Sequence, residues 1–174
     1  MRDRVSNMLQ DYTRRGKPTR EDYLAMAGEL DAWRRQSAWG GLWPQSPLMV
    51  TATLDDGWGH GLDIIEALAA SVGVAVHSLG VLQSPATIVQ ACRDRQPDLL
   101  GLTVLQFDSE DALIQITGSQ PPVTTQIAGG AADRYDPDFA ERTGTPPVAR
   151  DGRAFLQFLL GYQPAGQSAI EKLP

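Results

Sequence analysis

Few side chains in this sequence could carry out metal or nucleophilic chemistry. The 174 residues include two histidines, His60 and His77, and one cysteine, Cys92. A single cysteine excludes a disulfide within the chain and any zinc site built from several thiolates. Cys92 falls on the apolar face of an expected helix and His77 in an expected strand, so we interpret both as structural residues. No set of acid, base and nucleophile is apparent, which favours a binding role over independent catalysis.

The residues suited to ligand binding gather in three short segments. The first, Asp55–Gly61, reads DDGWGHG and combines two carboxylates with three glycines, Trp58 and His60. The second, Thr103–Leu105, places a hydroxyl at the end of an apolar run, and the third is the pair Gly129-Gly130. Glycine allows a backbone to approach a ligand closely, but it also allows a tight turn. Each segment alone is therefore compatible with either role.

The elements that must position these segments alternate between strand and helix. Apolar residues at helical spacing predict helices beginning near residues 61, 84, 110 and 151. Short apolar runs predict strands over residues 48–53, 74–79, 98–105 and 123–128, and a weak fifth over 143–149 that Pro146-Pro147 limits to an edge. This alternation predicts an α/β fold with a flavodoxin-like, doubly wound, five-stranded parallel sheet. Ligands of such sheets bind at the carboxyl ends of the strands, where the three segments would meet.

A short helical segment is expected before the sheet. Val5, Met8, Leu9 and Tyr12 fall at helical spacing, and Thr19 offers an N-cap for a second helix. Residues 38–47 are rich in glycine and proline yet contain two tryptophans, which is typical of a linker that packs against the protein. The predicted organisation is a two-helix cap and linker over 1–46, an α/β domain over 47–162 and a loose tail over 163–174.

Composition excludes several functional classes. The net charge of −6 and the pI near 4.8 argue against a protein that binds nucleic acid or membrane surfaces through a basic face. Hydrophobic residues at 42% and charged residues at 21% suit a folded chain rather than a disordered one. The charged N-terminal stretch does not resemble a signal peptide, and no apolar run is long enough to span a membrane. We therefore expect a cytoplasmic protein.

Taken together, the three segments resemble the cobalamin (vitamin B12)-binding domain of methionine synthase, methyltransferase corrinoid proteins and B12-dependent mutases. The family pattern is Asp-x-His-x-x-Gly followed, after 41 residues, by Ser-x-Leu, and residues 62–102 supply that spacing before Thr103. A Gly-Gly pair then follows in the family, as Gly129-Gly130 does here. The resemblance covers about residues 48–160 and implies a cobalamin cofactor. It places the cofactor-binding residues at Asp56, Gly57, Trp58, Gly59, His60, Gly61, Thr103, Leu105, Gly129 and Gly130.

The sequence departs from the family at the residue that binds cobalt from below. The family has a histidine there, whereas this chain has Trp58, whose indole N–H offers no lone pair to a metal. Three hypotheses follow: the cofactor binds base-off with unligated cobalt over the indole, His60 serves as the ligand after a shift of the loop, or the pocket has lost the cofactor. Without the family histidine, Asp56 would need another role, such as bonding Thr103 or the helix N-terminus.

Within the resemblance, the expected function is corrinoid or methyl-group carriage with a methyltransferase partner, or cobalamin-responsive regulation of a protein partner. The two-helix cap is shorter than that of typical family carriers. Trp33, Trp39 and Trp43 would either cover the upper face of the corrin or seal the linker onto the domain. The alternative is a degenerate domain that has lost cobalamin and serves as a protein-interaction module.

Two other classes share the expected topology. A phosphoacceptor receiver domain would use the acidic pair Asp55-Asp56, but it also needs a lysine after the fifth strand, and the chain has no lysine between Lys17 and Lys172. A flavodoxin-like FMN site would need serine or threonine in the first loop to hold phosphate, whereas Thr51 and Thr53 precede that loop. Both interpretations are therefore weaker than the corrinoid one.

Overall fold

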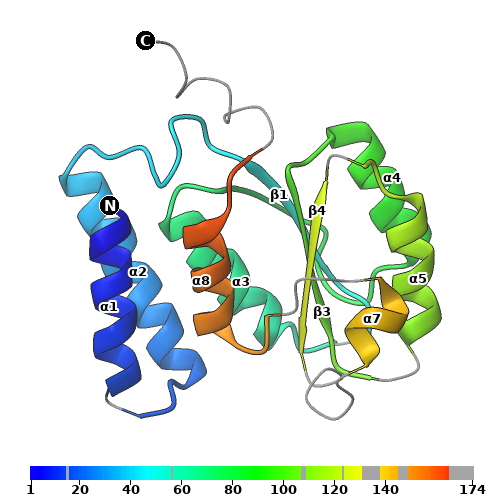
Figure 1. The fold of residues 1–174 in the computed structure, drawn as a ribbon, viewed down its shortest axis with the longest axis horizontal. Helices are drawn as coiled ribbons and strands as arrows, with labels where there is room; N and C mark the ends of the chain where they lie inside the picture. The colour runs from blue at the N-terminus through cyan, green and yellow to red at the C-terminus, as the bar shows by residue number, and fades with distance from the viewer. Residues whose placement is uncertain are drawn as a thin grey trace.

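A parallel sheet forms the centre of the protein in a computed structural model (Figure 1). The structure describes residues 1–14, 16–55, 57–106, 109–122, 124–130, 138–144 and 149–164. The strands are β1 (Leu48–Thr53), β2 (Ala75–Ser78), β3 (Leu99–Val104) and β4 (Thr125–Gly130), in the order β2-β1-β3-β4. In this register Thr53 lies beside Thr103, and Thr103 lies beside Gly129. The predicted α/β fold with a parallel sheet is confirmed.

The described residues contain four strands, so the prediction of five was wrong. Thr143, where the fifth strand was expected to start, ends a short helix, and residues 145–148 lie outside the described part of the chain. Ala149 donates one backbone hydrogen bond to the Ala128 carbonyl of β4, over 2.8 Å. Proline has no backbone N–H to donate to a ladder, which is why the sequence limited the expected fifth strand to an edge.

Helices cover both faces of the sheet (Figure 1). On one face lie α3 (His60–Ser71) and α8 (Gly152–Gly161), and on the other lie α4 (Pro85–Arg95) and α5 (Glu110–Ser119). The short α7 (Phe139–Thr143) is tied to α5 by the Arg142 guanidinium, which donates to both carboxylate oxygens of Glu110 over 2.9 and 3.0 Å. The N-terminal helices α1 (Arg2–Arg14) and α2 (Arg20–Gln36) form an antiparallel pair outside α3 and α8.

Alternating strand residues divide the core into two layers, because successive side chains of a strand point to opposite faces. Met49, Leu99 and Ile127 face α3 and α8, and Val50 and Leu100 face α4 and α5. The first layer continues into the N-terminal helical pair, whose buried residues belong to the same cluster. These residues are Val5, Met8, Leu9, Tyr12, Tyr23, Met26, Ala27 and Leu30.

Local signals account for the helix ends and the linker. Thr19 and Asp22 form the reciprocal capping box that starts α2. Leu42 N–H donates to the Val72 carbonyl over 2.8 Å, so the linker runs directly against the turn between α3 and β2. Trp43 is buried and its indole N–H donates to the Tyr162 carbonyl over 3.0 Å. The prediction that this linker packs against the protein is confirmed.

Candidate functional site

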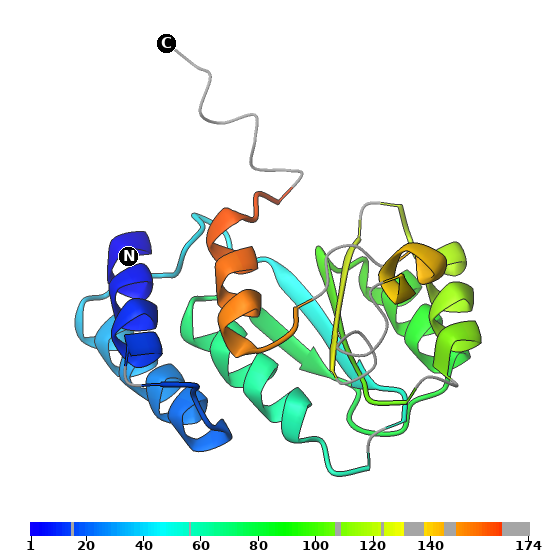
Figure 2. The same ribbon diagram turned by 60° about the horizontal axis from the view of Figure 1, so that its bottom comes forward.

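A cavity of about 330 Å³ lies at the carboxyl ends of the strands. Its walls come from four places: the ends of β3 and β4, the first turn of α3, the first turn of α8, and the turn between α1 and α2. Figures 1 and 2 show that these segments lie at the same end of the molecule. The cavity therefore depends on tertiary packing, because its walls include residues from both ends of the described chain.

Five of the ten predicted site residues come together in this cavity. They are Gly61, Thr103, Leu105, Gly129 and Gly130. Apolar side chains form most of the remaining wall, including Ile64 and Ile65 of α3, Ile127 of β4 and Phe155 of α8. An apolar enclosure with few polar groups is the usual character of a small-molecule site.

Thr103 is a buried polar residue in the cavity wall. Its side chain is 5% exposed, and its hydroxyl oxygen is buried without a hydrogen-bond partner among the described residues. A buried hydroxyl without a partner costs about 1–3 kcal/mol. Gly61 makes room beside it, because a Cβ added at Gly61 would lie 3.1 Å from the Thr103 methyl group. The wall thus offers a hydrogen-bonding group that a ligand could satisfy.

The Gly129-Gly130 pair has a packing reason of its own. A Cβ at Gly129 would lie 2.4 Å from the Ala149 carbonyl oxygen, and one at Gly130 only 1.8 Å from the Val104 carbonyl oxygen. Gly130 also has a φ of +143°, a conformation that side chains disfavour. The two glycines therefore allow close contacts between segments of the chain itself, whether or not a ligand is bound.

Asp55 holds the end of β3 in place, a role that the sequence did not reveal. One carboxylate oxygen accepts the Leu105 N–H over 2.9 Å, and the other accepts the Gln106 N–H over 2.8 Å and the Ser109 hydroxyl over 2.6 Å. These bonds position Leu105 at the cavity wall. The only signal was an acidic residue after the first strand, and recognising its role required knowing that β1 and β3 are neighbours. Asp56, the predicted site residue beside it, lies outside the described residues.

The other predicted residues of the first loop lie outside the cavity wall. Trp58 is 82% exposed, and its ring centroid lies 6.0 Å from that of the exposed His60. A Cβ at Gly59 would lie 3.1 Å from the Val81 side chain, and one at Gly57 would lie 3.7 Å from Leu82. The loop between β1 and α3 therefore packs against the loop between β2 and α4.

Three adjacent loops expose large apolar side chains at this end of the sheet. We call this surface the apolar rim. Its residues are Trp58, Val81, Leu82 and Leu105, with exposed fractions of 82%, 37%, 61% and 43%. Leu105 belongs both to the apolar rim and to the cavity wall, so the two features are continuous.

The idea that tryptophans of the N-terminal segment cover the site fails for Trp43. That indole is buried against Tyr162 at the end of α8, the opposite end of the helix from its cavity-lining first turn. Trp33 lies 13 residues beyond Arg20 on α2, which is about 20 Å along a helix from the cavity end. Its ring centroid is 6.3 Å from that of Trp39. Trp43 therefore seals the linker, the other role considered for it.

The titratable groups outside the site show structural roles. Burial raises the pKa of the Cys92 thiol to about 11, so this thiol is a packing group at neutral pH. Among the described residues, no three His, Cys, Asp or Glu side chains are grouped so as to hold a metal ion. No helix in the described part of the chain is long and apolar enough to span a membrane.

Comparison with known proteins identifies the fold. No family model and no curated protein matches the chain. Among solved structures, a cobalamin-binding protein from Desulfitobacterium hafniense DCB-2 matches with a TM-score of 0.71 and 15% identity, over 86% of this chain and 74% of that one. This chain has the same fold.

Two further structures support this assignment. The monomethylamine corrinoid protein of Methanosarcina barkeri matches with a TM-score of 0.60 and 17% identity, over 80% of this chain and 65% of that one. The methanol:cobalamin methyltransferase complex from the same organism contains a chain that matches with a TM-score of 0.56 and 16% identity, over 82% of this chain and 57% of that one. The structural neighbours of this chain are thus cobalamin-binding and corrinoid proteins.

Proposed function

We propose that this protein binds a cobalamin-type corrinoid base-off, without a histidine ligand to cobalt, and carries it in methyl transfer with a methyltransferase partner. The observation that carries the proposal is the buried, unpartnered Thr103 hydroxyl in the wall of a strand-end cavity. The names of the neighbouring structures, a corrinoid protein and a methyltransferase complex among them, support the choice of ligand and partner.

The residues present fit a corrinoid whose nucleotide tail lies in the cavity and whose macrocycle lies on the apolar rim. A volume of about 330 Å³ lies at the small end of the range for ligand pockets, which suits the nucleotide tail rather than the whole cofactor. The Thr103 hydroxyl, which lies between the small residues Gly61 and Gly129, would form a hydrogen bond with the nucleotide tail. The apolar rim would hold the macrocycle, which is broad and largely apolar on its faces.

Trp58 decides the proposed state of the cobalt. Its N–H is a hydrogen-bond donor only, so it cannot replace a histidine as metal ligand. The indole is 82% exposed on the apolar rim, so it presents apolar surface against which a flat ligand could pack. A bound corrinoid supplies a cobalt centre able to take up and release a methyl group, and the chain's own contribution is to hold the tail and shield one face.

Visible absorption after mixing with methylcobalamin and desalting tests the proposal. We expect the protein fraction to keep a corrin band with base-off character, because the cavity would withdraw the tail base from cobalt. A colourless protein fraction would reject corrinoid binding and leave the protein-interaction module as the explanation of the fold.

Two variants of the first loop test the ligand assignment. Trp58→His restores a side chain with a metal-binding lone pair, so we expect a shift in the cobalt-sensitive bands of the bound corrinoid. His60→Ala should leave those bands unchanged, because His60 is not the proposed ligand. A shift in His60→Ala, together with none in Trp58→His, would assign the cobalt ligand to His60 instead.

A methyl-transfer assay distinguishes methyl-group carriage from cobalamin-responsive regulation. A carrier should lose its cobalt-bound methyl group to an acceptor when the appropriate methyltransferase is added, and the loss is visible in the absorption spectrum. If bound methylcobalamin instead changes which protein is recovered in a pull-down, without transfer of the methyl group, the regulatory alternative would replace carriage.

A further inference from the structure

We propose that the turn between α1 and α2 forms an anion site at the mouth of the cavity, where Lys17 and Arg20 bind the phosphodiester of the nucleotide tail. This inference rests on the proposed corrinoid function and adds a specificity to it. The protein would select corrinoids with a complete nucleotide tail over those without one.

The charge of the cavity wall is opposite to that of the whole chain. The protein carries a net charge of −6. The described residues of the wall nevertheless include three cations, Lys17, Arg20 and Arg150, and a single acid, Asp151. Asp151 is engaged as the N-cap of α8, because its carboxylate accepts the Ala154 N–H over 2.8 Å. Asp63 and Glu21 lie beside Arg20, so the positive charge that the mouth offers to a ligand is chiefly that of Lys17, which favours a ligand that is anionic at that point.

Lys17 of the turn and Arg20, the first residue of α2, differ in the partners that they already have. Lys17 is exposed and forms no ion pair with any described residue. Arg20 bridges to Asp63 of α3 over 2.5 Å through one terminal nitrogen, its other terminal nitrogen lies 3.9 Å from the Glu21 carboxylate, and its Nε is buried without a partner among the described residues. The bridge holds Arg20 at the cavity wall beside α3. Because the Arg20 guanidinium already faces two carboxylates, Lys17 supplies the unpaired positive charge, and its ammonium group binds phosphate oxygens as a point charge.

Three helices also direct their N-terminal ends toward the same cavity. The first turns of α2, α3 and α8 all contribute wall residues, and all three start at the same end of the molecule (Figure 1). Helix N-termini carry partial positive charge that favours anions, although Asp22 already caps α2 and Asp151 already caps α8. The hydroxyl of Thr103, 5% exposed and without a partner, is an independent sign that this enclosure receives a polar ligand.

The phosphodiester of the nucleotide tail is an anion attached to a polar ligand group, so it would account both for the cations at the cavity mouth and for the unpartnered Thr103 hydroxyl. It links the tail nucleotide to the corrin ring, so it would sit between the apolar rim and the deep part of the cavity. Cobinamide is the matched ligand without this group, because it keeps the macrocycle and lacks both the phosphodiester and the base. Lys17 and Arg20 would therefore distinguish the two corrinoids, whereas the apolar rim would not.

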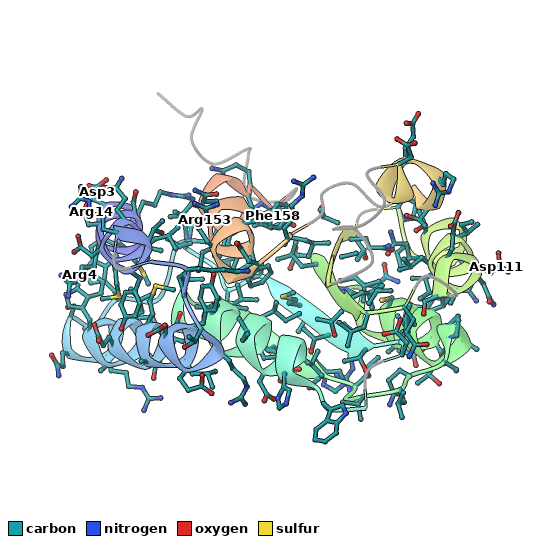
Figure 3. All side chains as sticks on the ribbon, turned by 90° about the horizontal axis from the view of Figure 1, so that it is seen from below. Asp3, Arg4, Arg14, Asp111, Arg153 and Phe158 are labelled. Atoms are coloured by element: carbon teal, nitrogen blue, oxygen red, sulfur yellow. The ribbon has the colours of Figure 1, made fainter. Side chains whose placement is uncertain are left out.

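Equilibrium dialysis with cobalamin and cobinamide, read by the visible absorption of the corrinoid, measures this selectivity. We expect wild-type protein to prefer cobalamin, and Lys17→Ala to weaken cobalamin binding about threefold to tenfold while leaving cobinamide binding unchanged. Arg14→Ala is the control, because it removes the same charge three residues earlier, from an exposed side chain outside the cavity wall (Figure 3). Equal losses in the two variants, or none in Lys17→Ala, would overturn the anion site.

Two further outcomes of the dialysis experiment distinguish failure of the anion site from failure of the proposed corrinoid function. If neither corrinoid binds to wild-type protein, both proposals fail. If both corrinoids bind with equal affinity, corrinoid binding stands and the anion site fails. Adenosine monophosphate is the third probe, because it carries a nucleotide phosphate without a corrin. Displacement of cobalamin by an equal concentration of this nucleotide would assign the site to free nucleotides and overturn the proposed selectivity.

Discussion

Replacing Thr103 by valine removes a buried hydroxyl and keeps the shape of the side chain. In the free protein that hydroxyl has no partner among the described residues, and an unpartnered buried group of this kind costs about 1–3 kcal/mol. Thr103→Val should therefore raise the free energy of unfolding by about 1 kcal/mol. For a chain of this size the corresponding rise in Tm is about 2–4 °C.

The same substitution should weaken binding of the proposed ligand. If the nucleotide tail of cobalamin hydrogen-bonds to Thr103, the lost bond is worth about 0.5–1.5 kcal/mol, which corresponds to a dissociation constant about twofold to tenfold higher. A variant that is more stable yet binds less tightly cannot be explained by general damage to the fold. Thermal unfolding and equilibrium dialysis with cobalamin measure the two quantities on the same protein sample.

Thr51→Val is the matched control. Thr51 is also buried on the sheet, but its hydroxyl donates to the Glu66 carboxylate over 2.6 Å, and its side chain is outside the cavity wall. Valine there should lower the free energy of unfolding by about 1–2 kcal/mol and leave cobalamin affinity unchanged. The proposed role of Thr103 is refuted if Thr103→Val destabilises the protein as much as Thr51→Val does, or if cobalamin binds equally well to Thr103→Val and wild type.

Three further predictions concern the surroundings of the cavity. Gly130→Ala should lower stability by more than 3 kcal/mol, because its Cβ would collide with the Val104 carbonyl, and a normal thermal unfolding curve would contradict this. Asp55→Ala should cost about 1–3 kcal/mol, since two backbone N–H groups lose their acceptor, and faster hydrogen exchange of those amides is the measurement. Cys92 should resist thiol reagents at pH 8 until denaturant is added. Because burial raises its pKa to about 11, the unfolded chain loses this proton first, so stability should fall as pH rises from about 9 toward 11.

Part of the site at the carboxyl ends of the strands could be predicted from the sequence. Apolar runs placed Thr103 and Gly129 at the ends of two predicted strands, and the structure pairs these strands and brings both residues into one cavity. Trp58 and His60 were predicted for the same site, but they lie on the outer surface beside it. A loop's position in sequence indicates which edge of the sheet it borders, whereas the direction of its side chains depends on the neighbouring loop that it contacts.

Sequence alone indicated the four strands and the described helices other than α7, but it also predicted a fifth strand that the described residues do not contain. These features could be predicted because each depends on residues within a few positions of one another. They include the helical and strand periodicity, the Thr19 cap and the Gly/Pro-rich linker. The absence of a lone pair on Trp58 is likewise a property of one side chain, and it restricts any cobalt chemistry whatever the fold.

Only the tertiary structure decided what surrounds the cavity. Asp55 reaches the backbone of Leu105 across 50 residues of chain, and the turn carrying Lys17 and Arg20 meets the first turn of α8, more than a hundred residues later. Such contacts arise when buried faces pack together, and local patterns do not specify which faces will meet. The cationic mouth of an acidic protein is therefore a property of its packing, because it exists only where distant segments converge.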